Sequence, residues 1–373
     1  MTDQSHTPGS RPRDRLRRGA APWLARAVFG LVLLLPACAL RLGDGGSASG
    51  PSEAPEAPPA PSEPDGSPTP PESSAPDGRA VAPACPPTSA ATVGTVATPG
   101  LTETSGLAAS QERPGRLWAH NDSGSAAAVH AIGSGGEDQG RVAVPAIDGI
   151  DIEDMALADG MLYLADIGDN NAQRDGVTVY RFPEPDPAAT GEITAVERVE
   201  LRYPDGAIDA EAMFVDPATG RLVIVAKALT LRLGGDSPVG PGPAPIFVVD
   251  PVWGGPPMTM TQVGTVALDE LDDQAEGPIP EGLIADFGLA GLATGADIRA
   301  DGSMIAIRTY RTVWLFPRAP GQSVADALAG VPCPARTVPE AQGEAVAFLN
   351  GGDGSFATVS EGTNPALNVT TVG

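Results

Sequence analysis

The stretch that decides the fold is Glu153-Asp-Met-Ala-Leu-Ala-Asp-Gly-Met-Leu-Tyr-Leu-Ala-Asp166. It consists of a short apolar run, an Asp-Gly pair and a second apolar run that ends in an acid. Such a pair between two apolar runs predicts a β-hairpin, because the turn requires residues that tolerate positive φ. The same order recurs around Gly- or Asp-containing turns at residues 211–227, 296–308 and 344–361, and in a more diverged form at 105–122.

Hairpins that recur at intervals of tens of residues predict an array of similar units, most simply an all-β protein with a β-propeller fold. The hairpins begin near residues 105, 153, 211, 296 and 344, so we expect five blades. A sixth blade near 270–294 is the alternative, although no hairpin pattern is visible there. Further apolar runs predict third strands at 177–182, 246–249, 312–316 and 366–369, and fourth strands at 196–201 and 262–268.

The last unit has no fourth strand of its own, because the sequence ends after its third. The stretch 91–97, just before the first hairpin, is expected to supply that outer strand and to close the ring. Closure is physically favoured, because it pairs strand edges that would otherwise be free.

The first 38 residues have the character of an export signal. Arginines within residues 11–18 precede an apolar run from Ala27 to Ala37, which is shorter than the roughly 20 residues of a membrane-spanning helix. Leu35-Pro-Ala-Cys38 resembles the bacterial lipobox, so Cys38 is the expected lipidated first residue of the mature protein. An ordinary cleaved signal, which would give a secreted protein, is the alternative. We expect contact with the membrane only through this lipid anchor.

Residues 39–87 are rich in Pro, Ser, Glu, Ala and Gly and nearly free of large apolar side chains, which predicts a disordered tether. Residues 88–373 form the predicted propeller domain, which we expect to be extracytoplasmic and monomeric. If Cys38 is lipidated, Cys85 and Cys333 remain as an even pair in an oxidising compartment. Cys85 precedes the closing strand and Cys333 falls near the outer edge of the fourth unit, so a disulfide between them is expected at the rim.

The formal net charge of −24 and the pI near 4.3 exclude nucleic acid as an expected partner, because phosphate binding needs clustered Lys and Arg. Aromatic residues make up only 4% of the chain, which argues against a broad sugar-stacking surface. The acidity fits either cation binding or simple solubility outside the cell.

Polar residues recur at both ends that a hairpin brings together. An inner strand is antiparallel to the second strand, so the start of one lies beside the end of the other. In a propeller these positions converge around one mouth of the central channel. The strand starts contribute Ser105, Glu153, Glu211, Asp297 and Glu344. The second-strand ends and following loops contribute Asn121, Asp122, Asp166, Lys227, Arg308, Ser360 and Glu361, with Asp169, Asn170, Arg174 and Arg311.

This ring of residues is compatible with two functions. Its carboxylates and amides are hard oxygen ligands that suit Ca²⁺. Lys227 and Arg308, with Asn121 and Asp122 beside them, could hold a small anionic ligand. One hypothesis is therefore a binding module for a ligand or protein partner, and the other a Ca²⁺-assisted hydrolase of phosphate esters or lactones, with unknown catalytic residues. The alternative to both functions is a channel mouth that binds no ligand, whose acidic and basic side chains only form ion pairs with one another.

Several motifs carry a resemblance to known proteins: 117–124, 152–156, 165–174, 209–213 and 359–362. Over most of 101–370 the chain resembles a group of exported bacterial propeller proteins of unestablished activity. More distantly, its Glu-Ala-Met and Glu-Ala-Val strand starts resemble β-propeller phytases, esterase-like phytase relatives and Ca²⁺-dependent lactonases. That resemblance implies Ca²⁺ at the channel mouth, with Glu153, Glu211, Glu344 and Asp166 as its ligands.

Overall fold

The computed structural model describes residues 85–373 with the exception of 125, 189–190, 228, 231–239, 276 and 287. The predicted signal, Cys38 and nearly all of the predicted tether lie outside the described residues. Within the described part, no helix is long and apolar enough to cross a membrane.

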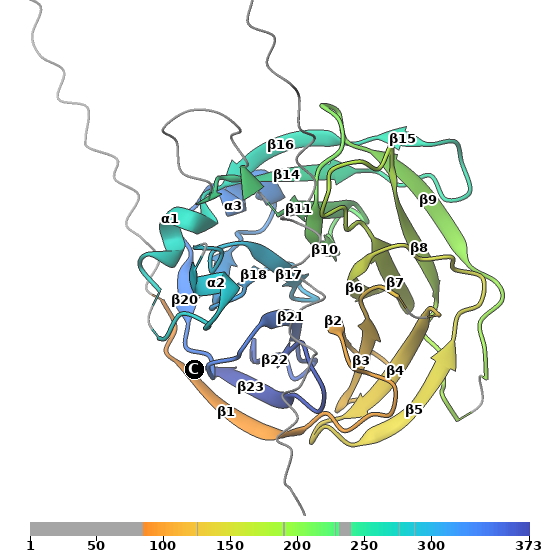
Figure 1. Cartoon of the computed structure of the whole chain (residues 1–373), viewed down its shortest axis with the longest axis horizontal. Coiled ribbons are helices and arrows are strands. Elements are labelled where there is room, and N and C mark those ends of the chain that lie inside the picture. The colour runs from red at the N-terminus through yellow and green to blue at the C-terminus, as the bar shows by residue number, and fades with distance from the viewer. Residues whose placement is uncertain are drawn as a thin grey trace, which may run out of the picture. The chain divides into compact units, whose positions relative to one another are not determined.

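Five sheets surround a central axis, and the first strand of each hairpin lies innermost (Figure 1). Blade 1 consists of β2 (Thr104–Ala109), β3 (Arg116–Asn121), β4 (Ala128–Gly133) and β5 (Asp138–Ala143). Blade 2 consists of β6 (Ile152–Ala158), β7 (Met161–Asp166), β8 (Val177–Pro183) and β9 (Glu197–Arg202), with β15 (Met258–Thr259) added in parallel at its edge. Blade 3 consists of β10 (Ala210–Val215), β11 (Leu222–Ala226), β14 (Ala244–Val249) and β16 (Thr261–Val266).

The last two blades complete the ring. Blade 4 consists of β17 (Ala293–Ile298), β18 (Met304–Thr309), β19 (Val313–Pro317) and β20 (Cys333–Ala335). Blade 5 consists of β21 (Gly343–Phe348), β22 (Phe356–Ser360), β23 (Ala366–Val372) and β1 (Thr88–Thr95). The remaining elements are the short pair β12 (Leu229–Thr230) and β13 (Gly240–Pro241) and the helices α1 (Leu268–Asp272), α2 (Leu283–Asp286) and α3 (Val324–Leu328).

The predicted five-bladed propeller is confirmed, and the region considered for a sixth blade contains α1 and α2. Arg311, in the loop between β18 and β19, holds this insertion in place. Its guanidinium donates to the backbone carbonyls of Asp272, Ala275 and Gly277. Arg311 therefore serves the fold and does not face the channel mouth.

Ring closure is also confirmed. β1 pairs antiparallel with β23 from Thr88↔Val372 to Thr95↔Ala366, and Figure 1 shows the two strands side by side at the outer edge. Cys85 is disulfide-bonded to Cys333, the first residue of β20, so the bridge joins blade 5 to blade 4. A disulfide of this kind indicates an extracytoplasmic location.

The apolar core is divided into five clusters, each packed between two neighbouring blades. Trp118 and Met155 pack between blades 1 and 2, and Phe214 and Trp314 pack between blades 3 and 4. The other clusters fill the interfaces of blades 2 and 3, 4 and 5, and 5 and 1. Each blade is thus buried on both faces near the axis, which explains why its two innermost strands are mostly apolar and almost completely buried.

We expect removal of the disulfide by Cys333→Ser to lower the free energy of unfolding by about 2–4 kcal/mol, because the bridge constrains the unfolded chain. Thermal or urea unfolding with and without reductant measures the effect. The variant serves as its own control, since reductant should not change its stability. Two reactive thiols besides Cys38 in the denatured, unreduced protein would contradict the bridge.

Candidate functional site

Each inner strand begins with a β-bulge at its second residue. In all five blades the register shifts between the first and third residues, so that the second is left over. These five bulge residues are Ser105, Glu153, Glu211, Thr294 and Glu344. Bulges re-aim side chains beside functional sites. The prediction of Asp297 at this position is wrong, because β17 begins four residues earlier and Thr294 takes the equivalent place.

A second set of equivalent residues comes directly after the second strand of each blade. This set consists of Asp122, Ile167, Lys227, Tyr310 and Glu361. Four of the five line a small cavity of about 70 Å³ at the channel mouth, together with four of the five bulge residues. The full lining is Glu103, Thr104, Ser105, Asp122, Glu153, Asn170, Glu211, Lys227, Tyr310, Gln342, Glu344 and Glu361.

In three blades the last residue of the second strand binds backbone groups of a neighbouring loop, whereas the residue after it lies at the channel mouth or next to it. Asn121 accepts the backbone N–H groups of Thr102 and Glu103, and Asp166 accepts those of Ile150 and Asp151. Ser360 likewise accepts the Gln342 N–H and donates to its carbonyl. These residues fix the loops that enter the inner strands. Asn121 and Asp166, predicted as direct ligand and metal contacts, thus position neighbouring residues and do not line the cavity.

The two predicted cations lie in different places, and both are paired. Lys227 lines the cavity and forms an ion pair with Glu211. Arg308 lies between blades 4 and 5 with a side chain only 1% exposed, and its Nη2 donates to Glu340 over 2.7 Å. The expected convergence on the mouth is therefore confirmed for Lys227 and wrong for Arg308.

Three carboxylates gather on one side of the mouth. Asp122, Asp151 and Glu153 each place one oxygen within 4.8 Å of the others. Oxygens at such separations can share one Ca²⁺, whose ligands lie at about 2.3–2.6 Å. Asp151 was missed in the sequence, although it stands two residues before a bulge acid. The same spacing recurs as Asp209 before Glu211, so the alternation of side chains along a strand was the available signal.

Burial dominates the electrostatics of this mouth. It raises the pKa of Asp122 to about 8, with Asp151 adding repulsion, and raises that of Asp151 as well. Burial likewise raises the pKa of Glu153 and Glu344 well above the usual range, with repulsion from Glu211 second in each case. Carboxylates this close to one another therefore repel unless a cation or protons intervene.

Glu211 differs from the other acids because a lysine is beside it. Burial raises its pKa to about 7, and the attraction of Lys227 opposes the rise. Burial alone would lower the pKa of Lys227, but its neighbours, with Glu211 the strongest, hold that pKa well above the ordinary value. The lysine engages one carboxylate oxygen, Oε1, whereas Oε2 is buried without a hydrogen-bond partner. An orphaned acceptor in the cavity wall fits a site built for cations.

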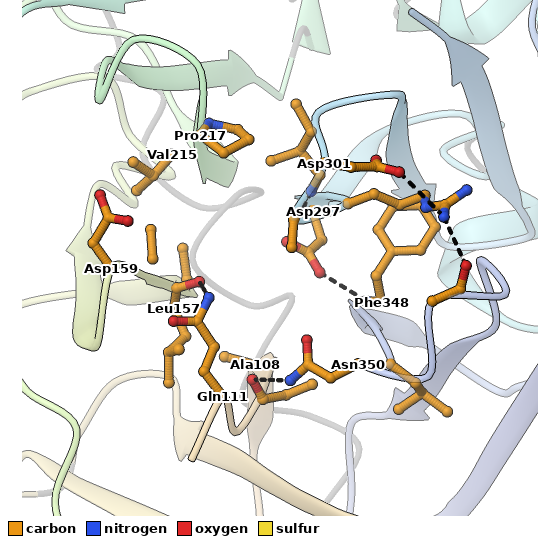
Figure 2. Close-up of a pocket in the computed structure, with 18 residues that line it drawn as sticks. Ala108, Gln111, Leu157, Asp159, Val215, Pro217, Asp297, Asp301, Phe348 and Asn350 are labelled. Carbon is orange, nitrogen blue, oxygen red and sulfur yellow. Dashed lines mark hydrogen bonds and ion pairs between the residues drawn. The ribbon is translucent and has the colours of Figure 1, made fainter. Parts of the chain in front are cut away.

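The opposite mouth of the channel holds a larger cavity of about 240 Å³, formed where the inner strands end (Figure 2). Asp297 lies here, and burial raises its pKa to about 7. Its carboxylate accepts the N–H groups of Ile298 and Phe348. Gln111 accepts the Gly160 N–H, and Asn350 donates to the Ser110 carbonyl. These polar groups are consumed in holding turns, so the first mouth is the stronger candidate.

Comparison with known proteins leaves the family open. A scan of protein-family models finds no match, and a search of curated proteins finds none either. Among solved structures, the PQQ-bound aldose sugar dehydrogenase of Streptomyces coelicolor is 14% identical, with a TM-score of 0.39 over 78% of this chain and 100% of that one. A calcium structure of a Trichoderma reesei carbohydrate-active enzyme of family AA12 is 11% identical, with a TM-score of 0.43 over 77% and 96%. At these identities the likeness concerns the fold alone.

Proposed function

We propose that this protein is an extracytoplasmic binding module whose channel mouth holds a divalent cation, Ca²⁺ by its ligand chemistry. The observation that carries the proposal is the cluster of Asp122, Asp151 and Glu153, whose oxygens are close enough to share one ion. Three carboxylates supply the hard oxygen donors that Ca²⁺ prefers. A bound ion would neutralise them and offer its remaining coordination positions to a ligand or partner at the mouth.

A small anionic ligand has no free cation to bind at this mouth among the described residues. Lys227 is paired with Glu211, and Arg308 is paired with Glu340 outside the cavity. The surrounding carboxylates would repel a phosphate or carboxylate group. An anionic ligand would therefore depend on the metal ion for its contact.

The alternative, a Ca²⁺-assisted hydrolase, has less support. A cavity of about 70 Å³ accommodates an ion and a few waters. Pockets that enclose organic ligands usually measure about 300–1,000 Å³. Lys227 is paired with Glu211, so none of the described cavity residues offers an unpaired cation to hold a phosphate ester beside the ion. The geometry thus favours ion binding over hydrolysis.

Calorimetric titration of the full-length protein with CaCl₂ tests the proposal. We expect one ion per chain, and the titration should extend to about 10 mM, because extracellular modules bind Ca²⁺ with Kd values of about 10⁻⁴–10⁻³ M. Glu153→Gln should weaken binding by about 10- to 100-fold, since it removes one charge from the donor set. Glu112→Gln, an exposed acid on blade 1, is the matched control. Absence of Ca²⁺ binding to the parent protein would refute the proposal.

A further inference from the structure

The acidic mouth consists of two parts that differ in how their charge is balanced. The cluster of Asp122, Asp151 and Glu153 forms no ion pair with any described residue. On the other side of the cavity, Lys227 reaches in among Glu211, Glu344 and Glu361. One part is therefore open to an ion from solution, whereas the other already contains a positive charge.

The ammonium group of Lys227 is surrounded by the kinds of group that bind a free cation. Its ammonium is paired with Glu211, and it lies 5.4 Å from the centre of the Tyr310 ring, whose π face attracts cations. Glu344 lies close enough to help keep it charged. The side chains of Lys227 and Glu211 are only 12% and 8% exposed, so little water takes part.

The side of the cavity around Lys227 has more carboxylate oxygens than one ammonium group can engage. Glu211 Oε2 is buried, lacks a partner and belongs to a residue that is 6% exposed. Glu344 and Glu361 both accept from the amide of Gln342, Glu344 through its Oε1 over 2.7 Å, which keeps these two carboxyl groups together. Glu211, Glu344 and Glu361 all line this side of the cavity, and removal of the lysine would leave them without a neutralising cation.

We propose that the ammonium of Lys227 is the built-in occupant of a second cation subsite, and that it limits the mouth to one divalent ion from solution. The first cation subsite is the cluster of Asp122, Asp151 and Glu153, and this inference rests on the proposed function for the ion bound there. Buried carboxylates require either a cation or protons. Once the tethered cation is removed, the vacated carboxylates should take up a second divalent ion.

The test compares the full-length protein with Lys227→Met, which keeps most of the length of the side chain and removes its charge. Calorimetry with CaCl₂ should give one ion per chain for the parent and two for the variant. Lys227→Arg, which keeps a tethered cation, should remain at one. The double variant Lys227→Met/Glu211→Gln should return from two ions to one, because Glu211 supplies the orphaned oxygen.

The outcomes separate this inference from the function on which it rests. No ion in the parent would refute the proposed first subsite, and a variant that nevertheless binds one ion would still support the second. One ion in both parent and Lys227→Met would refute the second subsite alone. If the variant unfolds without Ca²⁺, addition of 10 mM Ca²⁺ should restore its circular dichroism spectrum, since the ion replaces the ammonium. A variant that stays unfolded under those conditions contradicts the inference.

Discussion

Replacement of Asp154 by alanine is expected to lower the free energy of unfolding by about 3–5 kcal/mol, because each buried donor left without a partner costs about 1–3 kcal/mol. The side chain is fully buried beside the channel axis. Its Oδ2 accepts the N–H groups of Met213 in blade 3 and Ala296 in blade 4, and its Oδ1 accepts that of Met155. One carboxyl group therefore joins the inner strands of three blades.

Asp154→Asn is the matched control. Its single carbonyl oxygen can keep both bonds between blades and lose only the one to Met155. Burial raises the pKa of Asp154 well above the usual range, although its three N–H donors oppose the rise. We expect asparagine to retain most of the stability that alanine loses in urea unfolding. An alanine variant as stable as the parent would show that the blades do not depend on this connection.

Replacement of Glu340 by alanine is expected to lower the free energy of unfolding by about 3–5 kcal/mol. This is the usual effect of leaving a buried charge without its partner. Glu340 Oε2 accepts from Arg308, and its Oε1 accepts from Thr358 and Asn368. Arg308 Nε and Nη1 already lack partners, so loss of the carboxylate would leave the guanidinium almost unsatisfied. Urea unfolding of parent and variant measures the difference.

A double-mutant cycle distinguishes the ion pair from packing. Arg308→Met removes the buried charge while keeping much of the apolar volume. The double variant Arg308→Met/Glu340→Ala should therefore lose clearly less stability than the sum of the two single variants. Strict additivity would mean that the two side chains do not act as a pair. Gly343 must remain unchanged in this series, because a Cβ there would collide with the Arg308 guanidinium.

The sequence predicts the blades well because hairpin patterns are local. The turn at Asp159-Gly160 and the apolar runs on either side are adjacent in the chain, and residues 91–97 show an apolar strand pattern without a partner nearby. The register of side chains is harder to predict. β17 begins at Ala293, earlier than its apolar pattern indicates, so the residue at the bulge is Thr294 and not Asp297. The cavity is also lined by residues that follow the second strands.

The charge pairing at the site depends on contacts between distant segments, which spacing does not reveal. Lys227 and Arg308 look alike in the sequence, each at the end of a second strand. Arg308 lies inside β18, one residue before its end, whereas Lys227 follows the end of β11, two positions further along. Arg308 is therefore buried between two blades, and Lys227 lies at the mouth. The sequence does not reveal the role of Asp154 for a similar reason, because its three partners come from three different inner strands.

The pairing of β1 with β23 also has a consequence for the order in which the protein folds. A chain made from its N-terminus presents β1 first and β23 last, and bonded residues such as Thr92 and Asn368 are 276 positions apart. β1 therefore remains unpaired until β23, the last strand, has been synthesised. Its sequence, Thr-Ser-Ala-Ala-Thr-Val-Gly-Thr, contains a single large apolar residue. Such a strand is a poor template for aggregation, so it can stay unpaired until the ring is complete.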